Sequence, residues 1–264
     1  MSLAFERRKK FILKKLADEE KLHVSELAET LDVSTETIRR DLDRLEKEGR
    51  LKKVYGGAVL AASFPWEPPF DEKSAINSKQ KRVIGKMAAS LVNDGDIIMV
   101  GNGTTPLEMI RYLGNKKNVT LITHSGPAML LATEVFKGKI IFIGGEVDIN
   151  QKSTTGPLAE TALYKLKANK AFISAGGVSL KEGITDYDLN QAHISNIMIE
   201  RSEELIVLAD HTKLGESTFA HICPLDKVSI IISDWDYPKN WKKQLEEKNI
   251  KLLLPDKEDF ENSF

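Results

Sequence analysis

The sequence predicts an α/β protein with a small N-terminal winged helix-turn-helix domain and a larger, mostly parallel α/β domain. Residues 22–59 contain two short amphipathic helical patterns and then a basic hairpin pattern, the order of parts in a winged helix. From Lys79 onward, helical patterns alternate with short apolar runs, as in parallel α/β sheets. The 264-residue chain is long enough for both. We therefore expect domains over residues 1–60 and 78–264, joined by a linker over 61–77.

The first half of the helix-turn-helix is predicted by residues 24–31. Their apolar side chains are spaced for one short amphipathic helix with Ser25 as its N-cap. Asp32 and Val33 are expected to form a tight turn, and Ser34 is expected to cap the next helix. This spacing is typical of a helix-turn-helix over about residues 22–41.

The second helix has an apolar face and a basic face. Ile38, Leu42 and Leu45 recur at intervals of four and three residues, so they should face the core. An arginine at the start of such a helix can place its guanidinium against O6 and N7 of guanine, whereas one further along more often contacts phosphate. The arginines could instead only solvate the helix and pair with neighbouring carboxylates. The polar residues left on outward or flanking faces are Thr35, Thr37, Arg39, Arg40 and Arg44.

A basic wing favours the DNA-binding interpretation. Residues 51–59 alternate apolar and polar around Gly56-Gly57, as a hairpin requires, and Lys52 and Lys53 could reach the DNA backbone. A basic run at residues 7–10 would add phosphate-facing charge, or be only a solvated first turn. The predicted DNA-binding residues are Ser34, Thr35, Thr37, Arg39, Arg40, Arg44, Lys52 and Lys53.

The charge distribution has the sign that an N-terminal DNA-binding domain requires. Residues 1–57 hold fourteen Lys or Arg and twelve Asp or Glu, a balance of +2. The rest of the chain holds twenty-four and twenty-seven, a balance of −3. The asymmetry is modest, but it places the excess of cations in the predicted winged helix.

Composition argues against a disulfide-bonded, metal-binding or membrane-spanning protein. The single cysteine, Cys223, allows no disulfide within the chain, and the five histidines show no metal-ligand spacing, so we expect no metal. The N-terminus lacks a long apolar segment and no run approaches about twenty apolar residues, so we expect a soluble, cytoplasmic protein without a membrane partner.

Residues 61–74 are predicted to form a semi-rigid connection. They contain three prolines and several apolar residues without helical or strand periodicity. Trp66 and Phe70 are expected to pack onto the second domain.

In the second domain, seven apolar runs are predicted strands and five amphipathic stretches are predicted helices. Most runs are continuously apolar, as expected when helices cover both faces of a parallel sheet. The strands are predicted at residues 96–100, 119–123, 140–143, 171–175, 205–209, 228–233 and 251–254. The helices are predicted at residues 81–92, 106–113, 127–136, 158–167 and 190–202.

Small and polar residues follow these strands at the rim where ligands of parallel sheets gather. In Gly101-Asn102-Gly103-Thr104-Thr105-Pro106, glycines allow a close backbone approach, and a phosphate could sit at the helix N-terminus. An ordinary strand-to-helix turn remains the alternative, because the Walker lysine is missing. Lys213 could neutralise a phosphate beyond a later strand. The candidate ligand-binding residues are Asn102, Gly103, Thr104, Thr105, His124, Ser125, Gly144, Gly176 and Lys213.

Two motifs identify a family resemblance. Thr37-Ile38-Arg39-Arg40-Asp41-Leu42 followed by Gly56-Gly57-Ala58 resembles the winged helix of the DeoR family of bacterial transcriptional regulators, over residues 7–60. Tyr55 departs from the histidine common there.

The second domain resembles the sensor domain of the same family, which is similar to ribose-5-phosphate isomerase and CoA-transferase folds. The resemblance implies that this domain senses a phosphorylated sugar. Gly101 stands where an aspartate is common in the family and Gln191 where a glutamate is common, so the resemblance does not identify a particular sugar. The matching segments are Gly103-Thr104-Thr105, Gly144-Gly145, Gly156-Pro157, the turn at Gly176 and Leu208 to Lys213.

The leading hypothesis is therefore a transcriptional repressor of a sugar or carbohydrate operon, controlled by a phosphorylated sugar, without a cofactor or catalysis. We expect it to bind operator DNA as a homo-oligomer, either a dimer or a tetramer. A rival hypothesis is a sugar-phosphate isomerase with a DNA-binding appendage, in which Asp186, Asp188, Glu146 and Lys213 supply the chemistry. A third makes the second domain an assembly module only.

Overall fold

The computed structural model describes residues 3–19, 21–47, 50–54, 56–59 and 67–255, and they divide into two compact units, Met1–Trp66 and Glu67–Phe264. Tyr55, Trp66 and the linker positions 61–66 lie outside the described residues, and so does the side chain of Lys52. The predicted domain boundaries stay a prediction.

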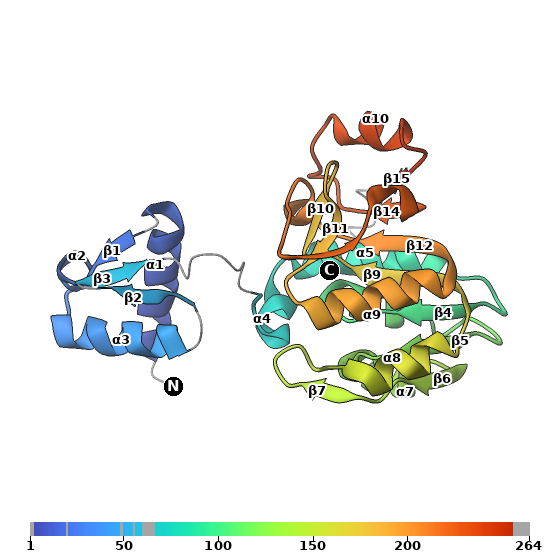
Figure 1. Ribbon diagram of the computed structural model, residues 1–264, viewed down its shortest axis with the longest axis horizontal. Coiled ribbons are helices and arrows are strands. Elements are labelled where there is room, and N and C mark those ends of the chain that lie inside the picture. Colours follow the sequence, from blue (N-terminus) through green and yellow to red (C-terminus); the bar gives the residue numbers. More distant parts are fainter. Residues whose placement is uncertain (1–2, 20, 48–49, 55, 60–66, 256–264) are drawn as a thin grey trace. The chain divides into compact units, whose positions relative to one another are not determined.

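The described residues of the first unit form three helices and a small antiparallel sheet (Figure 1). The helices are α1 (Leu3–Glu19), α2 (Val24–Thr30) and α3 (Thr35–Lys47). The strands β1 (Lys21–His23), β2 (Lys52–Val54) and β3 (Gly57–Val59) pair in the order β1-β3-β2. The predicted helices, tight turn and wing are thus present, whereas α1 as a long helix and β1 are additions to the prediction.

The start of α2 corrects the prediction for Ser25. The helix begins at Val24 with His23 as its N-cap, and His23 makes no side-chain cap. Pairing of β1 with β3 holds the backbone extended up to His23, so the chain passes directly from strand to helix and Ser25 falls inside the first turn. Gly57 is required opposite β1, because a Cβ there would lie 1.9 Å from the Leu22 carbonyl oxygen.

The second unit is built on a seven-stranded, fully parallel sheet in the order β15-β14-β12-β9-β4-β5-β6. All seven predicted strands are in it, with shifted ends. Their bounds are β4 (Ile97–Val100), β5 (Thr120–Thr123), β6 (Lys139–Phe142), β9 (Ala168–Ser174), β12 (Ser202–Leu208), β14 (Ile230–Ile232) and β15 (Lys251–Leu253).

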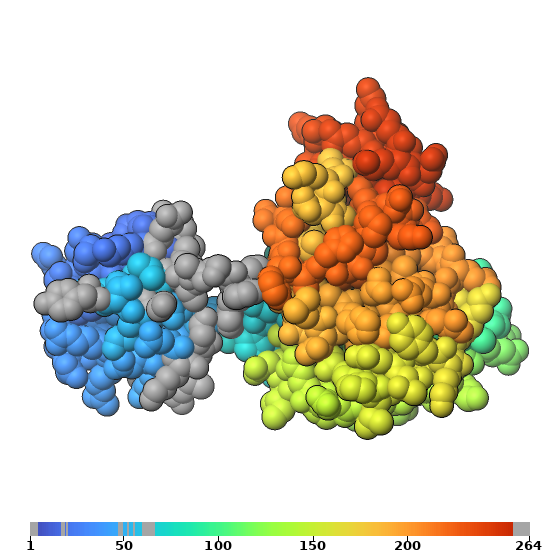
Figure 2. Space-filling model, in the orientation of Figure 1, coloured from blue at the N-terminus to red at the C-terminus, as the bar shows by residue number. Residues whose placement is uncertain are grey.

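Two buried clusters lie on opposite faces of the sheet. Alternate strand residues enter different clusters: Met99 packs with Leu163 and Ile197, whereas Ile98 packs with Ile84. One face is therefore covered by α8 (Gly156–Tyr164) and α9 (Leu189–Glu200), and the other by α5 (Ser78–Ser90), α6 (Thr104–Ile110) and α7 (Gly126–Val135). All five predicted helices are present. In Figure 2 the orange surface of α9 adjoins the yellow-green surface of α8, in agreement with their contact.

Smaller elements surround this sheet. Strands β7 (Glu146–Asp148) and β8 (Ser153–Thr155) form an antiparallel pair, and β10 (Gly177–Ser179), β11 (Gly183–Asp186) and β13 (Ala220–Cys223) form a three-stranded sheet. Two short turns, η1 (His211–Lys213) and η2 (Leu225–Lys227), and α10 (Trp241–Glu246) complete the unit. These strands were not predicted, because three or four residues are too few to show a period.

The predicted linker contains a helix, α4 (Phe70–Ala75), which corrects the expectation of an aperiodic spacer there. Phe70 is 3% exposed, so its predicted packing onto the second unit is confirmed. Among the residues of α4 it alone is buried, so the segment shows no helical repeat in the sequence.

Two further predictions concerned the single cysteine and membrane-spanning segments. Cys223 is buried in β13, and burial raises the pKa of its thiol to about 12. None of the helices in the described ranges combines the length and apolar character needed to span a bilayer.

Candidate functional site

Helix α3 carries the predicted DNA-contacting side chains on the face opposite its buried residues. Thr35, Arg39 and Arg40 are exposed, and Thr37 is half-buried. Ser34 caps the helix as predicted, because its Oγ accepts a hydrogen bond from Thr37 N at 3.2 Å. The helix therefore starts at a fixed residue, with its basic side chains turned to solvent.

The arginines of α3 differ in their partners. Arg39 Nη1 lies 3.6 Å from Glu36 Oε2 in an exposed pair that stabilises little. Arg40 has no ion pair among the residues that the structure describes. The Arg44 guanidinium lies 5.1 Å from the centroid of the Phe5 ring, so it packs against α1. Arg39 and Arg40 are thus the arginines most available to a ligand.

The wing is fixed beside α3. Lys53 Nζ forms an ion pair with Asp43, and Lys53 N donates to Glu46 Oε1 at 2.8 Å. The wing cation therefore lies next to the exposed face of α3. Whether these side chains contact DNA stays a prediction.

The N-terminal basic run is partly structural. Arg8 Nε and Nη2 donate to the two carboxylate oxygens of Asp41 at 2.6 and 3.2 Å, and Asp41 is 4% exposed. For Arg8 the expectation of a phosphate-facing charge is therefore wrong, because its guanidinium is committed to holding α1 against α3.

The second unit has a cavity of about 100 Å³ at the carboxyl ends of three neighbouring strands, β4, β9 and β12. Residues 103–105, 174–176, 208–210 and 212–213, at the ends of these strands and directly after them, line it. The remaining lining residues are Glu67, Pro68, Lys73, Ile76, Lys81, Asp186 and Tyr187. The cavity thus lies where open parallel sheets bind ligands.

Three lysines converge on this cavity. Lys81 is 6% exposed and its Nζ donates to the Lys73 carbonyl oxygen at 2.6 Å. Lys213 Nζ lies 3.4 Å from Tyr187 Oη, and Lys73 forms an ion pair with Glu67. Burial lowers the pKa of Lys81 to about 8, with the Asp210 carboxylate opposing that effect. A cavity with this many cations fits an anion.

Carboxylates balance these lysines. Burial, together with the nearby negative charge of Glu67, raises the pKa of Asp186 to about 7. Asp210 is 3% exposed and accepts hydrogen bonds from Asn77 Nδ2 at 3.3 Å and from Thr212 N at 3.0 Å. An anion that enters the cavity would therefore compete with carboxylates for the lysines.

Five of the nine candidate ligand-binding residues line the cavity, which supports the predicted rim but leaves their role a prediction. Gly103 has φ +128°, and a Cβ there would lie 2.5 Å from Ser174 Oγ, so glycine is required. Thr104 and Thr105 are 7% and 6% exposed. The five are Gly103, Thr104, Thr105, Gly176 and Lys213.

The other four lie outside the cavity lining. Ser125 caps α7, its Oγ accepting from Ala128 N at 3.5 Å, and Gly144 stands in open space. His124 is 2% exposed, because β8 covers the end of β5 and Thr154 N donates to the His124 carbonyl oxygen at 3.0 Å. Both His124 ring nitrogens and Asn102 Oδ1 are buried without a hydrogen-bond partner within the described ranges. Burial lowers the pKa of His124 to about 4.

The acid–base set of the rival isomerase hypothesis is only half assembled. Asp186 and Lys213 both line the cavity. Asp188 Oδ1 instead caps α9, accepting from Asn190 N and Gln191 N at 2.9 and 3.0 Å. Glu146 is exposed on β7.

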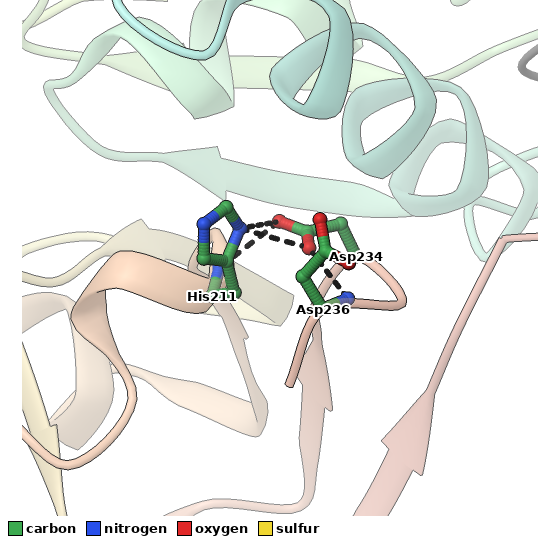
Figure 3. Close-up of side chains that lie close together, drawn as sticks. All are labelled: His211, Asp234 and Asp236. Carbon is green, nitrogen blue, oxygen red and sulfur yellow. Dashed lines mark hydrogen bonds and ion pairs between the residues drawn. The ribbon is translucent and has the colours of Figure 1, made fainter. Parts of the chain in front are cut away.

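Beside the cavity, a buried carboxylate anchors η1 (Figure 3). His211 Nδ1 lies 3.0 Å from Asp234 Oδ1, and His211 N donates to Asp234 Oδ2 at 2.9 Å. Asp236 N donates to Asp234 Oδ1 at 3.0 Å. These three residues also have the geometry of possible metal ligands. The hydrogen bonds alone account for the buried Asp234 carboxylate, so the arrangement does not require a cation.

Sequence reasoning missed several cavity residues, among them Lys73, Lys81 and Asp210. Lys81 had a usable signal: with Ile84 and Ala88 it follows the i, i+3, i+7 spacing of the buried face of α5, where a lysine needs an explanation. Lys73 had none, because it reaches the cavity from a short helix in a segment without a repeat.

Two family models match the chain. The "DeoR-like helix-turn-helix domain" matches residues 8–64, and the "DeoR C terminal sensor domain" matches residues 76–235. A solved ribose 5-phosphate isomerase A from Methanocaldococcus jannaschii is 24% identical in sequence, and the match covers 52% of this chain and 55% of that chain with a TM-score of 0.40.

Curated relatives align over most of the chain. The uncharacterized HTH-type transcriptional regulator YulB of Bacillus subtilis is 36% identical, over 88% of this chain and 89% of that protein. The HTH-type transcriptional regulator GolR of Listeria innocua is 31% identical, over 95% and 98%. The lactose phosphotransferase system repressor of Staphylococcus aureus is 34% identical, over 81% and 86%.

Proposed function

The chain belongs to the DeoR family of bacterial transcriptional regulators, and on this premise we propose that it represses a sugar- or carbohydrate-utilisation operon under the control of a phosphorylated sugar. As a member of this family it is a DNA-binding regulator and not an enzyme. The sugar phosphate would bind in the cavity of the second unit and release the operator.

One observation carries the choice of effector class: three lysines and three threonines line one small cavity at the carboxyl ends of parallel strands. Lysine ammonium groups and threonine hydroxyls are donors suited to a phosphate, and the polar walls suit sugar hydroxyls. The name of the Staphylococcus aureus relative, a lactose phosphotransferase system repressor, supports both repression and sugar metabolism.

The proposed partners follow from the two units. Operator DNA would contact the exposed face of α3 and the wing, and a homo-oligomer would place two such faces on repeated half-sites. A regulator of this kind acts where the chromosome is, so we place it in the cytoplasm. For control to work, the sugar phosphate must bind the DNA-free arrangement more tightly than the DNA-bound one.

A mobility-shift titration tests this proposal. The full chain is titrated against DNA from upstream of its own gene cluster at stated salt, with and without ribose 5-phosphate, fructose 1-phosphate and glucose 6-phosphate. Release of specific binding by one of them supports the proposal. Specific binding that a broad panel of sugar phosphates leaves unchanged contradicts the effector class, and robust turnover of a sugar phosphate would contradict the binding-only cavity.

Lys213→Ala provides the matching variant. It should weaken the response to the sugar phosphate about tenfold, since one charge-assisted contact is worth roughly 1.5–3 kcal/mol, and it should leave operator binding intact. Lys181→Ala is the control, because the Lys181 side chain is 90% exposed. Unchanged induction in Lys213→Ala would remove Lys213 from the site.

A further inference from the structure

The seven-stranded sheet ends in an unpaired edge at β6. This strand pairs with β5 on one side, and no strand of the described residues pairs with it on the other (Figure 1). Lys139 N and Ile143 N donate to carbonyl oxygens on the β5 side. Because the hydrogen-bonding groups of a strand alternate in direction, those of Ile140 and Phe142 point away from the sheet. In the described part of the chain these N–H and C=O groups have no hydrogen-bond partner.

The edge lacks the usual protection against pairing with another strand. Soluble proteins protect such edges with charges, proline, a bulge or a covering element. The four residues of β6 include one charged residue, Lys139 at the start, and no proline, and their pairing with β5 has no bulge. Phe142 is 40% exposed. Ile140 packs in the cluster beneath α7, and since strand side chains alternate, Phe142 lies on the same face.

Helix α7, which covers this face beside β6, also exposes apolar side chains. Only Ala128 and Ala132 of α7 are buried, whereas Leu130 is 62% exposed and Glu134 is the only charged residue of the helix. A helix whose outer face meets only water normally carries polar and charged residues there. The four most exposed large hydrophobic side chains of the described residues all come from this part of the sequence: Ile149, Leu158, Val147 and Leu130.

We propose that β6 and α7 form a two-fold interface with a second copy of this chain, in which the two β6 strands pair antiparallel and join the two sheets. The proposal rests on the proposed function only for the expectation of a homo-oligomer, and it adds the surface that forms the assembly. A second copy fits because the edge is complementary to itself. When Ile140 lies opposite the partner's Phe142, each such pair exchanges two hydrogen bonds. Every free N–H and C=O group of Ile140 and Phe142 is then satisfied in both copies.

The same register brings apolar side chains together and keeps like charges apart. Each Phe142 ring packs against the partner's Ile140, a cross-strand pair of an aromatic and a β-branched residue. The two-fold axis passes beside Ile141, so the two Lys139 ammonium groups lie at opposite ends of the paired strands. Parallel pairing of the strands would instead place these like charges side by side, which is unfavourable. The axis is perpendicular to the sheet, so both α7 helices lie on one face with their apolar outer positions toward each other.

A cysteine substitution at the two-fold axis tests the register. The two copies of residue 141 face each other as a non-hydrogen-bonded pair with about 4.5 Å between their Cα atoms, a separation that a disulfide can span. Ile141→Cys should therefore form an intermolecular disulfide in the full chain under mild oxidation, seen as a dimer on a non-reducing gel. Ile140→Cys is the matched control, because its two copies are offset by two residues along the strands, beyond the Cα separation of about 7 Å that a disulfide allows. The native Cys223 is buried and does not compete.

Sedimentation velocity of the full chain tests the apolar surface. Leu130→Lys and Phe142→Lys should each raise the dissociation constant of self-association about tenfold or more, because assembly would bury a lysine without a partner. If the wild type is a tetramer with a second kind of interface, these variants should sediment as dimers. Leu189→Lys is the matched control, since Leu189 is 60% exposed but begins α9 on the opposite face of the sheet.

The outcomes separate this inference from the proposed function. A monomeric wild type, unchanged self-association in both lysine variants, or a disulfide yield in Ile141→Cys no higher than in Ile140→Cys overturns the inference. The cysteine pair decides independently of how the lysine variants fold. None of the residues that line the cavity comes from β6 or α7, so sugar-phosphate binding should be unchanged in all these variants. Operator binding that no sugar phosphate releases, together with the expected disulfide, would contradict the effector class and leave this interface standing.

Discussion

The two units hold their cations in opposite ways. On α3 of the winged helix, Arg39 and Arg40 are exposed, and Arg39 has only a weak exposed partner. In the cavity, Lys81 is buried and Lys73 is largely covered and paired with Glu67. Exposed cations suit a polyanion that brings its own counterions, and binding of that kind depends strongly on salt. Covered cations that line a small cavity suit a small anion.

From this difference we expect that DNA binding and sugar-phosphate binding can be lost independently of each other. A change inside the first unit should remove DNA binding and leave sugar-phosphate binding intact, and a change inside the second should do the reverse.

Loss of the buried ion pair should have the largest effect. Asp41→Ala leaves the Arg8 guanidinium without its carboxylate between α1 and α3, and breaking such a pair costs about 3 kcal/mol. For a unit this small we expect partial unfolding of residues 1–59 and loss of operator binding. Urea unfolding followed by circular dichroism measures the change. Asp43→Ala is the matched control, because Asp43 is about half-exposed. Unaltered unfolding of Asp41→Ala would show that the pair contributes nothing.

Proton binding at His124 should oppose folding of the second unit as pH falls, while the first unit has no buried histidine among its described residues. The pKa of His124 is lowered from 6.5 to about 4, so between these values the unfolded chain binds a proton that the folded chain does not. Proton binding at His124 therefore has little effect on stability at pH 7, and it destabilises the folded chain as pH falls, by about 2 kcal/mol between pH 7 and 5.

Asp186 acts in the opposite direction, because its raised pKa makes the folded chain bind the extra proton below about pH 7. The test is thus the difference between wild type and His124→Gln in unfolding free energy at pH 5 and 7. This difference should shift in favour of His124→Gln at pH 5. Equal pH dependence in the two proteins would contradict the prediction.

The smallest expected effect is that of one exposed arginine. Arg39→Ala should weaken specific operator binding by about 1 kcal/mol, the low end for a base contact, because Arg39 must first leave Glu36. Titrations with the operator and with a scrambled fragment at several salt concentrations measure it, and Arg82→Ala on the other unit is the control. An equal loss on both fragments would make Arg39 a phosphate contact instead.

The same contrast explains how much the sequence could predict. The exposed face of α3 could be predicted because Ile38, Leu42 and Leu45 mark the buried side within one helix. Arg39 and Arg40 must then lie on the exposed side. The seven parallel strands were readable because burial on both faces demands continuous apolar runs.

The residues that line the cavity could not be predicted in this way. Lys73 and Asp210 are 137 positions apart, and only the packing of the segment Glu67–Ile76 beside the sheet brings both to the same cavity. Ser25 and His124 show a second limit. An N-cap and a ligand contact both depend on a neighbour, here β1 and β8, that is too short to leave a pattern in the sequence.

The burial of Cys223 has a practical consequence for spectroscopy. Thiolate is the form that reacts with maleimides and nitroxide reagents, and with a thiol pKa of about 12 and a 2% exposed side chain Cys223 should stay unlabelled at neutral pH. It is the only cysteine of the chain. A cysteine introduced at an exposed position such as Lys181 would therefore carry the only label of each protomer. The number and separation of labels in an assembly would then count its copies and report their spacing, with no need to remove the native thiol.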